Sequence, residues 1–119
     1  MHEARTDQSK NQLYITLGGF SSVDQVEQTV QEVKQAVQNL KPGFDVITDV
    51  STYRPARPEV ATAIQQMQLF LRQAGMRRVV RVLSSSAIAS MQFSRLGKEA
   101  GYEAEHAASV AEAEKLLES

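Results

Sequence analysis

Residues 44–75 read FDVITDVSTYRPARPEVATAIQQMQLFLRQAG, and this stretch decides the fold. Its first seven residues are rich in β-branched types and predict a strand. A polar loop over 51–57 follows, and an apolar stripe with helical spacing then predicts a helix that begins at Pro58 and ends before Gly75. In an α/β protein this order places a loop and a helix N-terminus at the carboxyl end of a strand, where such folds bind ligands and partners.

The rest of the chain repeats this alternation of strands and helices. Ser22 with Gln25, and Ser109 with Glu112, have the spacing of capping boxes at helix starts. Further strands are predicted over 13–17, 77–83 and 102–106, and further helices over 22–40, over 87–100 and after Ser109. We therefore predict a single α/β domain with a mostly parallel sheet of about four strands and about four helices, in the order β-α-β-α-β-α-β-α.

The beginning of the chain differs from this pattern. Residues 1–11 (MHEARTDQSKN) are polar and show no periodicity. We therefore predict a flexible N-terminal tail over residues 1–11 and one folded domain over residues 12–119.

The composition argues against several classes of protein. Hydrophobic residues make up 42% of the chain and charged residues 23%, as in an ordinary globular domain. The chain has no cysteine, which excludes disulfides and cysteine-ligated zinc and suits a reducing compartment. No apolar run is long enough to span a membrane, and the net charge of −1 argues against a nucleic-acid binder. We expect a cytoplasmic protein.

Charged residues are distributed unevenly along the chain. Residues 54–98 hold eight basic side chains and one acidic side chain, Glu59, whereas residues 99–119 hold six acidic side chains and one basic one, Lys115. Two interpretations stay open. Either the basic residues form a surface that faces an anion, or the charges are partitioned among helices that meet in space.

The sequence offers no recognisable catalytic group. The one histidine of the predicted domain is His106, and no second metal ligand lies at a useful helical spacing from it. Asp45 and Asp49 would lie too far apart along a strand for a direct carboxylate pair. The two glycines at 18 and 19 lack the spacing of a dinucleotide or P-loop fingerprint. A response-regulator receiver would need an acidic pair at those positions. We expect no enzyme activity, no metal and no cofactor.

A binding edge is the stronger expectation. If the first three strands are parallel, the segments that follow them lie at one edge of the sheet, and each precedes a helix whose free N–H groups favour anions. The residues predicted to bind a phosphate or a small acidic ligand there are Gly18, Gly19, Ser21, Ser22, Ser51, Ser84 and Ser85.

Several segments share a pattern with a known family. Residues 13–37 combine a strand, glycines and an amphipathic helix, and a strand then ends in Asp49-Val50-Ser51. The run FLRQAG at 70–75 precedes a valine-rich strand, and SVAEA at 109–113 follows Gly101. In these features most of the chain resembles the STAS domain family, the anti-sigma-factor antagonist and sulfate-transporter domain, in particular its SpoIIAA-like members.

The resemblance implies a non-catalytic regulatory module that acts by binding another protein. The contact surface would be the loop over 51–58 with the start and outer face of the helix that follows it. The implied partner-binding residues are Tyr53, Arg54, Arg57, Glu59 and Leu69. A homodimer is a further candidate assembly, although no residue pattern predicts it. The alternative function is a carrier or sensor of a small anionic or lipid-like ligand at the loop edge of the sheet.

Two features depart from the family pattern. At the start of the helix after the Asp-Leu-Ser strand, the family carries a serine that a partner kinase phosphorylates. This chain has Arg57-Pro58-Glu59-Val60 there, with Glu59 near the position of that serine, so we expect the phosphorylation switch to be absent. The family also has an additional N-terminal strand, which the polar residues 1–11 do not predict.

Overall fold

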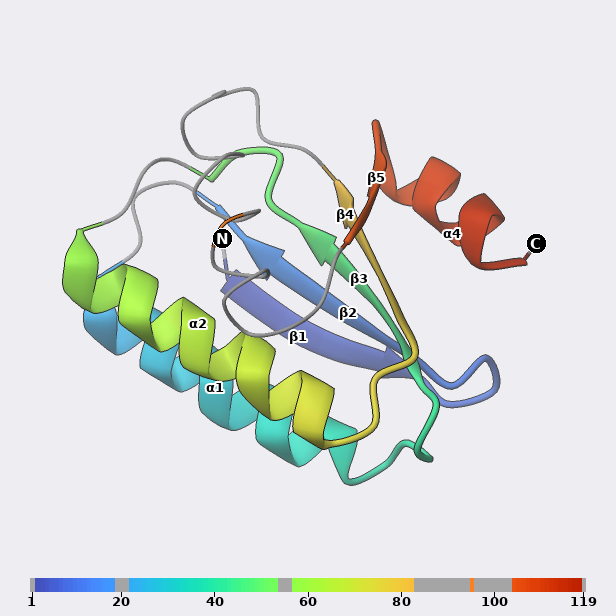
Figure 1. Cartoon of the computed structure of the whole chain (residues 1–119), viewed down its shortest axis with the longest axis horizontal. Coiled ribbons are helices and arrows are strands. Elements are labelled where there is room, and N and C mark those ends of the chain that lie inside the picture. Colours follow the sequence, from blue (N-terminus) through green and yellow to red (C-terminus); the bar gives the residue numbers. More distant parts are fainter. Residues whose placement is uncertain (1, 19–21, 54–56, 83–94, 96–103, 119) are drawn as a thin grey trace.

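The computed structural model describes residues 2–18, 22–53, 57–82, 95 and 104–118. In this part of the chain five strands form one sheet: β1 (His2–Asp7), β2 (Gln12–Leu17), β3 (Asp45–Asp49), β4 (Arg78–Val82) and β5 (Glu105–Ala107). The helices with described bounds are α1 (Val23–Val37), α2 (Pro58–Gln73) and α4 (Val110–Glu118) (Figure 1). Apart from residue 95, the helix predicted over 87–100 lies outside the described residues.

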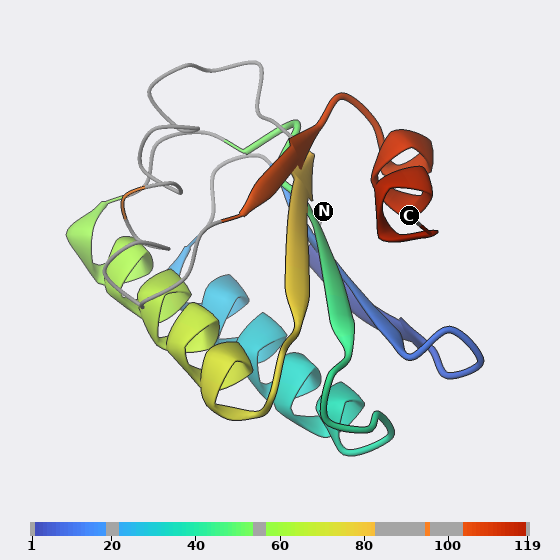
Figure 2. The same ribbon diagram turned by 45° about the vertical axis from the view of Figure 1, so that its right-hand side comes forward.

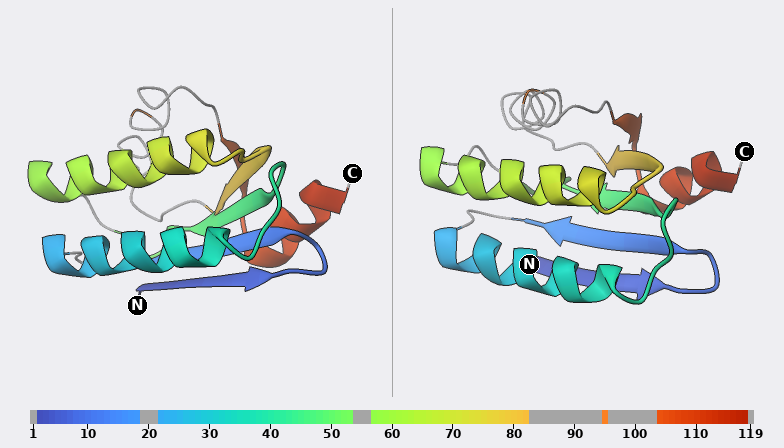
Figure 3. Two further views of the ribbon diagram at one scale, coloured as in Figure 1. Left: turned by 90° about the horizontal axis from the view of Figure 1, so that it is seen from below. Right: turned by 60° about the horizontal axis from the view of Figure 1, so that its bottom comes forward.

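The sheet is mostly parallel, as the sequence predicts. Its strands lie in the order β1-β2-β3-β4-β5. The strands β2 to β5 are parallel to one another, and β1 runs antiparallel to β2. The helices α1 and α2 lie side by side on one face of the sheet, whereas α4 lies on the other face (Figures 2 and 3).

The core has two parts because both faces of the sheet are covered. In β2, Leu13 and Ile15 join the cluster beneath α1 and α2, whereas Tyr14 joins the cluster beneath α4. In β3, Val46 joins the cluster beneath α1 and α2, and Ile47 joins the cluster beneath α4. Burial on both faces explains why the inner strands have nearly continuous apolar sequences.

The prediction of a flexible tail over residues 1–11 is wrong for β1. Residues 2–7 pair with 12–17 as an antiparallel hairpin, and the turn closes through Asn11, which has a φ of +54° and donates its N–H to the Gln8 carbonyl. Ala4 packs against the core, and the Arg5 guanidinium lies 4.0 Å from the centroid of the Tyr14 ring. The sequence of β1 lacks an apolar pattern because it is an edge strand that buries little side-chain surface.

The predicted capping residues begin the two helices as expected. At α1, the Gln25 N–H donates to Ser22 Oγ at 3.2 Å, and the Ser22 N–H donates to Gln25 Oε1 at 3.0 Å. At α4, the Glu112 N–H donates to Ser109 Oγ at 3.1 Å. The carboxylate of Glu112 accepts from the Ala108 N–H at 3.3 Å, one residue before the position that a capping box would use.

Two arginines of the basic region pair with acidic residues of neighbouring segments. Arg77 donates through Nη2 and Nε to the carboxylate of Asp45, at 2.6 and 3.0 Å. Arg78 does the same to Glu105, at 2.7 and 2.8 Å. These contacts neutralise part of the basic region within the fold, but they join strands of the sheet and the residue before β4, and not helices as the sequence interpretation has it.

The pair of Arg78 and Glu105 makes the stability depend on pH. Hydrogen bonds from Arg78 hold the pKa of Glu105 below its ordinary value of 4.5. A lowered folded-state pKa stabilises the protein above the unfolded-state pKa, and this contribution is lost as the pH falls through the folded-state value. We expect Glu105→Gln to lower the melting temperature slightly at neutral pH, and the difference from wild type to shrink as the pH falls below the ordinary pKa of a glutamate. A difference that persists in acid would contradict this account.

Candidate interaction surface

The loop edge of the sheet contains some of the residues that the sequence predicts to bind an anion. Gly18 is buried where β2 ends. The hydroxyl of Ser22 caps α1, and Ser51 donates its Oγ–H and its N–H to Asp49 Oδ1, at 2.7 and 3.0 Å. Both serines therefore make hydrogen bonds within their own turns. Gly19, Ser21, Ser84 and Ser85 lie outside the described residues.

The start of α2 is exposed. Arg57 is the N-cap residue, its side chain makes no capping hydrogen bond, and both Arg57 and Glu59 are exposed. Glu59 stands in the first turn, where the helix dipole favours a negative charge. A cation and an anion are thus both available to a partner here. Arg54, the other predicted contact in this region, lies outside the described residues.

Tyr53 does not lie where the sequence analysis expects it. Its side chain is 1% exposed and belongs to the core cluster beneath α1 and α2. Burial raises the pKa of Tyr53 to about 12. Its N–H donates to the Val50 carbonyl in a tight turn at the end of β3. Tyr53 therefore fills the core beside the loop and cannot act as a surface contact in this conformation.

Leu69 lies on the outer face of α2, as predicted. It is 39% exposed, whereas Ile64, Met67 and Leu71 of the same helix are at most 2% exposed. Among the described residues it is the large hydrophobic side chain that falls in the exposed class. A single exposed leucine is common on protein surfaces. Only the neighbouring surface can therefore indicate whether Leu69 belongs to a binding site.

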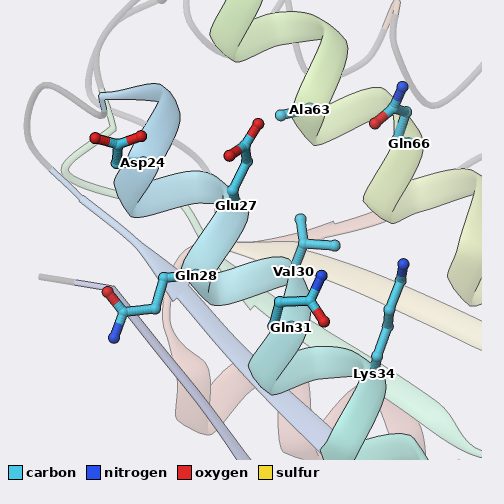
Figure 4. A pocket seen from close by; sticks show the side chains of 8 residues that line it. All are labelled: Asp24, Glu27, Gln28, Val30, Gln31, Lys34, Ala63 and Gln66. Carbon is cyan, nitrogen blue, oxygen red and sulfur yellow. The ribbon is translucent and has the colours of Figure 1, made fainter.

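A groove of about 470 Å³ lies between α1 and α2, and Leu69 is not among its lining residues. Its lining residues are Asp24, Glu27, Gln28, Val30, Gln31 and Lys34 from α1, with Ala63 and Gln66 from α2. Figure 4 shows Glu27 and Lys34 extending from α1 toward α2, whereas Gln28 points away from that helix. The groove therefore has mixed polar and apolar walls, and α1 supplies two acidic groups, Asp24 and Glu27, and one basic group, Lys34.

The chemistry of the groove suits hydrogen bonding more than catalysis. Glu27 and Lys34 are seven residues apart on α1, which places their Cα atoms roughly 10 Å apart along the helix. The Lys34 ammonium lies 5.7 Å from the centroid of the Phe70 ring, an arrangement that favours an ordered lysine. The glutamine amides supply donors and acceptors between the charges.

The sequence analysis missed this groove. The sequence shows that the polar residues of α1 lie off its apolar stripe, but it does not show which of them face a neighbouring helix. The available signal was the position of Glu27 and Lys34 one heptad apart, which places them on the same side of α1.

The sequence matches no model of a known protein family and no curated protein. In the ranges that the structure describes, no helix is long and apolar enough to cross a membrane. The same ranges contain no group of three or more histidine, cysteine, aspartate or glutamate side chains placed to hold a metal ion.

Proposed function

We propose that this chain is a non-catalytic, STAS-like regulatory module that binds another protein through the outer face of α1 and α2 and the start of α2. We further propose that it works without the serine phosphorylation of SpoIIAA-like proteins, because Arg57, Pro58 and Glu59 carry no hydroxyl group where that serine would stand.

The observation that supports this proposal best is the length of surface over which charged, polar and apolar groups are exposed on this face. Glu59 and Leu69 are ten residues apart on α2, which corresponds to roughly 15 Å along the helix. The groove toward α1 lies beside that stretch. A protein partner can contact the charged helix start, the groove and Leu69 together, whereas a small molecule would contact only one of them.

The strand β1 also supports the proposal. The N-terminal residues do not predict the additional strand of the STAS family, yet residues 2–7 form such a strand beside β2. This removes one of the two departures from the family pattern. The other departure, at Glu59, concerns the switch and leaves the contact surface available.

The alternative function is a carrier or sensor of a small anionic or lipid-like ligand at the loop edge. It has less support, because the described serines there, Ser22 and Ser51, already make hydrogen bonds within their turns. Their hydroxyl groups would have to exchange partners to bind an anion.

Native mass spectrometry of the chain purified gently from its own host distinguishes the two functions. We expect a non-covalent complex between this chain and a different protein. A chain that instead carries a small molecule, released on denaturation, and no second protein would contradict the interaction module and support the carrier.

A further inference from the structure

The strand β1 forms one border of the sheet. It stands at one end of the strand order, and no other strand pairs with its outer side in the described part of the chain. Figure 3 (left) shows β1 at the border of the molecule, beyond α1. An edge strand exposes backbone N–H and C=O groups that can pair with another strand.

This edge lacks two of the usual features that prevent pairing, prolines and bulges. The sequence of β1, HEARTD, contains no proline or glycine, and its six residues pair with β2 in continuous register, without a bulge. Proteins commonly protect edges with prolines, bulges or charged side chains. Here the strand is regular, and its charged side chains on one face, Glu3, Arg5 and Asp7, are of both signs.

The charges of β1 complement a second copy of the same strand. Glu3 and Arg5 flank Ala4, and they point to one face because side chains alternate along a strand. In an antiparallel pair with Ala4 opposite Ala4, each Glu3 lies opposite Arg5 of the second copy. In this arrangement the two-fold axis that relates the two copies passes beside Ala4. If the axis passed beside residue 3 or residue 5 instead, like charges would lie opposite each other, which is unfavourable.

The side chains are free to change partners. Within one chain the Arg5 Nε lies 3.6 Å from Glu3 Oε1, and the two side chains are 56% and 48% exposed. An exposed ion pair of this kind contributes little to stability, so its exchange for pairs across the interface costs little. Ala4 packs toward the core on the opposite face and is too small to obstruct a neighbouring sheet.

We propose that two copies of this chain associate through antiparallel pairing of β1 with β1, centred on Ala4, to form one continuous ten-stranded sheet. Six residues make a small interface, so the dimer dissociates on dilution. The α1/α2 face proposed for the protein partner is a separate surface, and the two proposals stand or fall independently.

Sedimentation velocity of the purified full chain over a range of concentrations tests this proposal. Wild type is expected to shift from monomer to dimer as the concentration rises. Arg5→Glu and Glu3→Arg each place like charges opposite each other twice, so each is expected to weaken dimerisation at least about tenfold. Glu3→Arg keeps the contact between Arg5 and Tyr14, which controls for damage to the hairpin.

Two combinations make the test specific for the register. The double variant with Glu3→Arg and Arg5→Glu is expected to dimerise again, because the opposite charges return with their positions exchanged. The two single variants are each expected to be monomeric alone and to form a heterodimer when mixed. A wild type that stays monomeric at every concentration, or single variants that dimerise as well as wild type, would overturn the proposal.

Discussion

Replacement of Gly75 by valine is expected to lower the free energy of unfolding by about 2–5 kcal/mol. Gly75 has a φ of +101°, which a β-branched residue adopts only with strain. A Cβ atom at this position would also lie 3.3 Å from both Cα and Cβ of Pro42. The Gly75 carbonyl accepts a hydrogen bond from the Gly43 N–H at 2.7 Å, so the two segments have little room to separate.

Gly43 supplies a matched control for this prediction. Its φ of +87° is also unfavourable for valine, but a Cβ atom there meets nothing within 4 Å. Gly43→Val therefore has only the conformational cost, about 1–3 kcal/mol. Urea denaturation of both variants should give the larger loss for Gly75→Val. Equal losses, or a larger one for Gly43→Val, would show that the contact with Pro42 adds no strain.

The double variant Arg57→Glu with Leu69→Glu is expected to lose the protein partner almost completely. Arg57 is a cation at the start of α2, and Leu69 is an exposed apolar group farther along the same helix. Reversal of the charge and introduction of an unpaired charge at an apolar contact should weaken binding by roughly 100-fold or more. The measurement is the amount of partner that co-purifies with the variant from the host.

Folding and surface effects can be separated in that experiment. Both side chains are exposed, so the melting temperature should stay within a few degrees of the wild type. Lys115→Glu on α4 is the control, because it adds negative charge to an exposed position on the opposite face of the sheet. The interaction surface would be misplaced if Lys115→Glu removed the partner equally well.

The sequence predicts those parts of the fold that depend on local signals. The capping serines Ser22 and Ser109 and the glycine after α2 mark element boundaries through short-range hydrogen bonds and backbone conformation. The apolar patterns of β2, α1 and α2 predict these elements correctly. The two helices each bury one continuous stripe, and β2 buries both of its faces. Such signals are present in a few neighbouring residues.

The parts that the sequence does not predict depend on contacts between elements. β1 is polar, and it is ordered by pairing with β2 and by the contact of Arg5 with Tyr14. Tyr53 stands in a polar loop, and only the packing of the assembled core shows that its ring is buried. The groove requires α1 and α2 to lie side by side, so Glu27 and Lys34 have no special meaning in the sequence alone.

Site-specific photo-cross-linking in the protein's own host tests the proposed interaction surface most directly. A photoreactive amino acid replaces Leu69 in one variant and Lys115, on the other side of the sheet, in a matched variant. We expect irradiation to join position 69 to a different protein and to give no such product from position 115. No product at position 69, or the same product in equal amount from position 115, would contradict the assignment of the α1/α2 face as the binding surface.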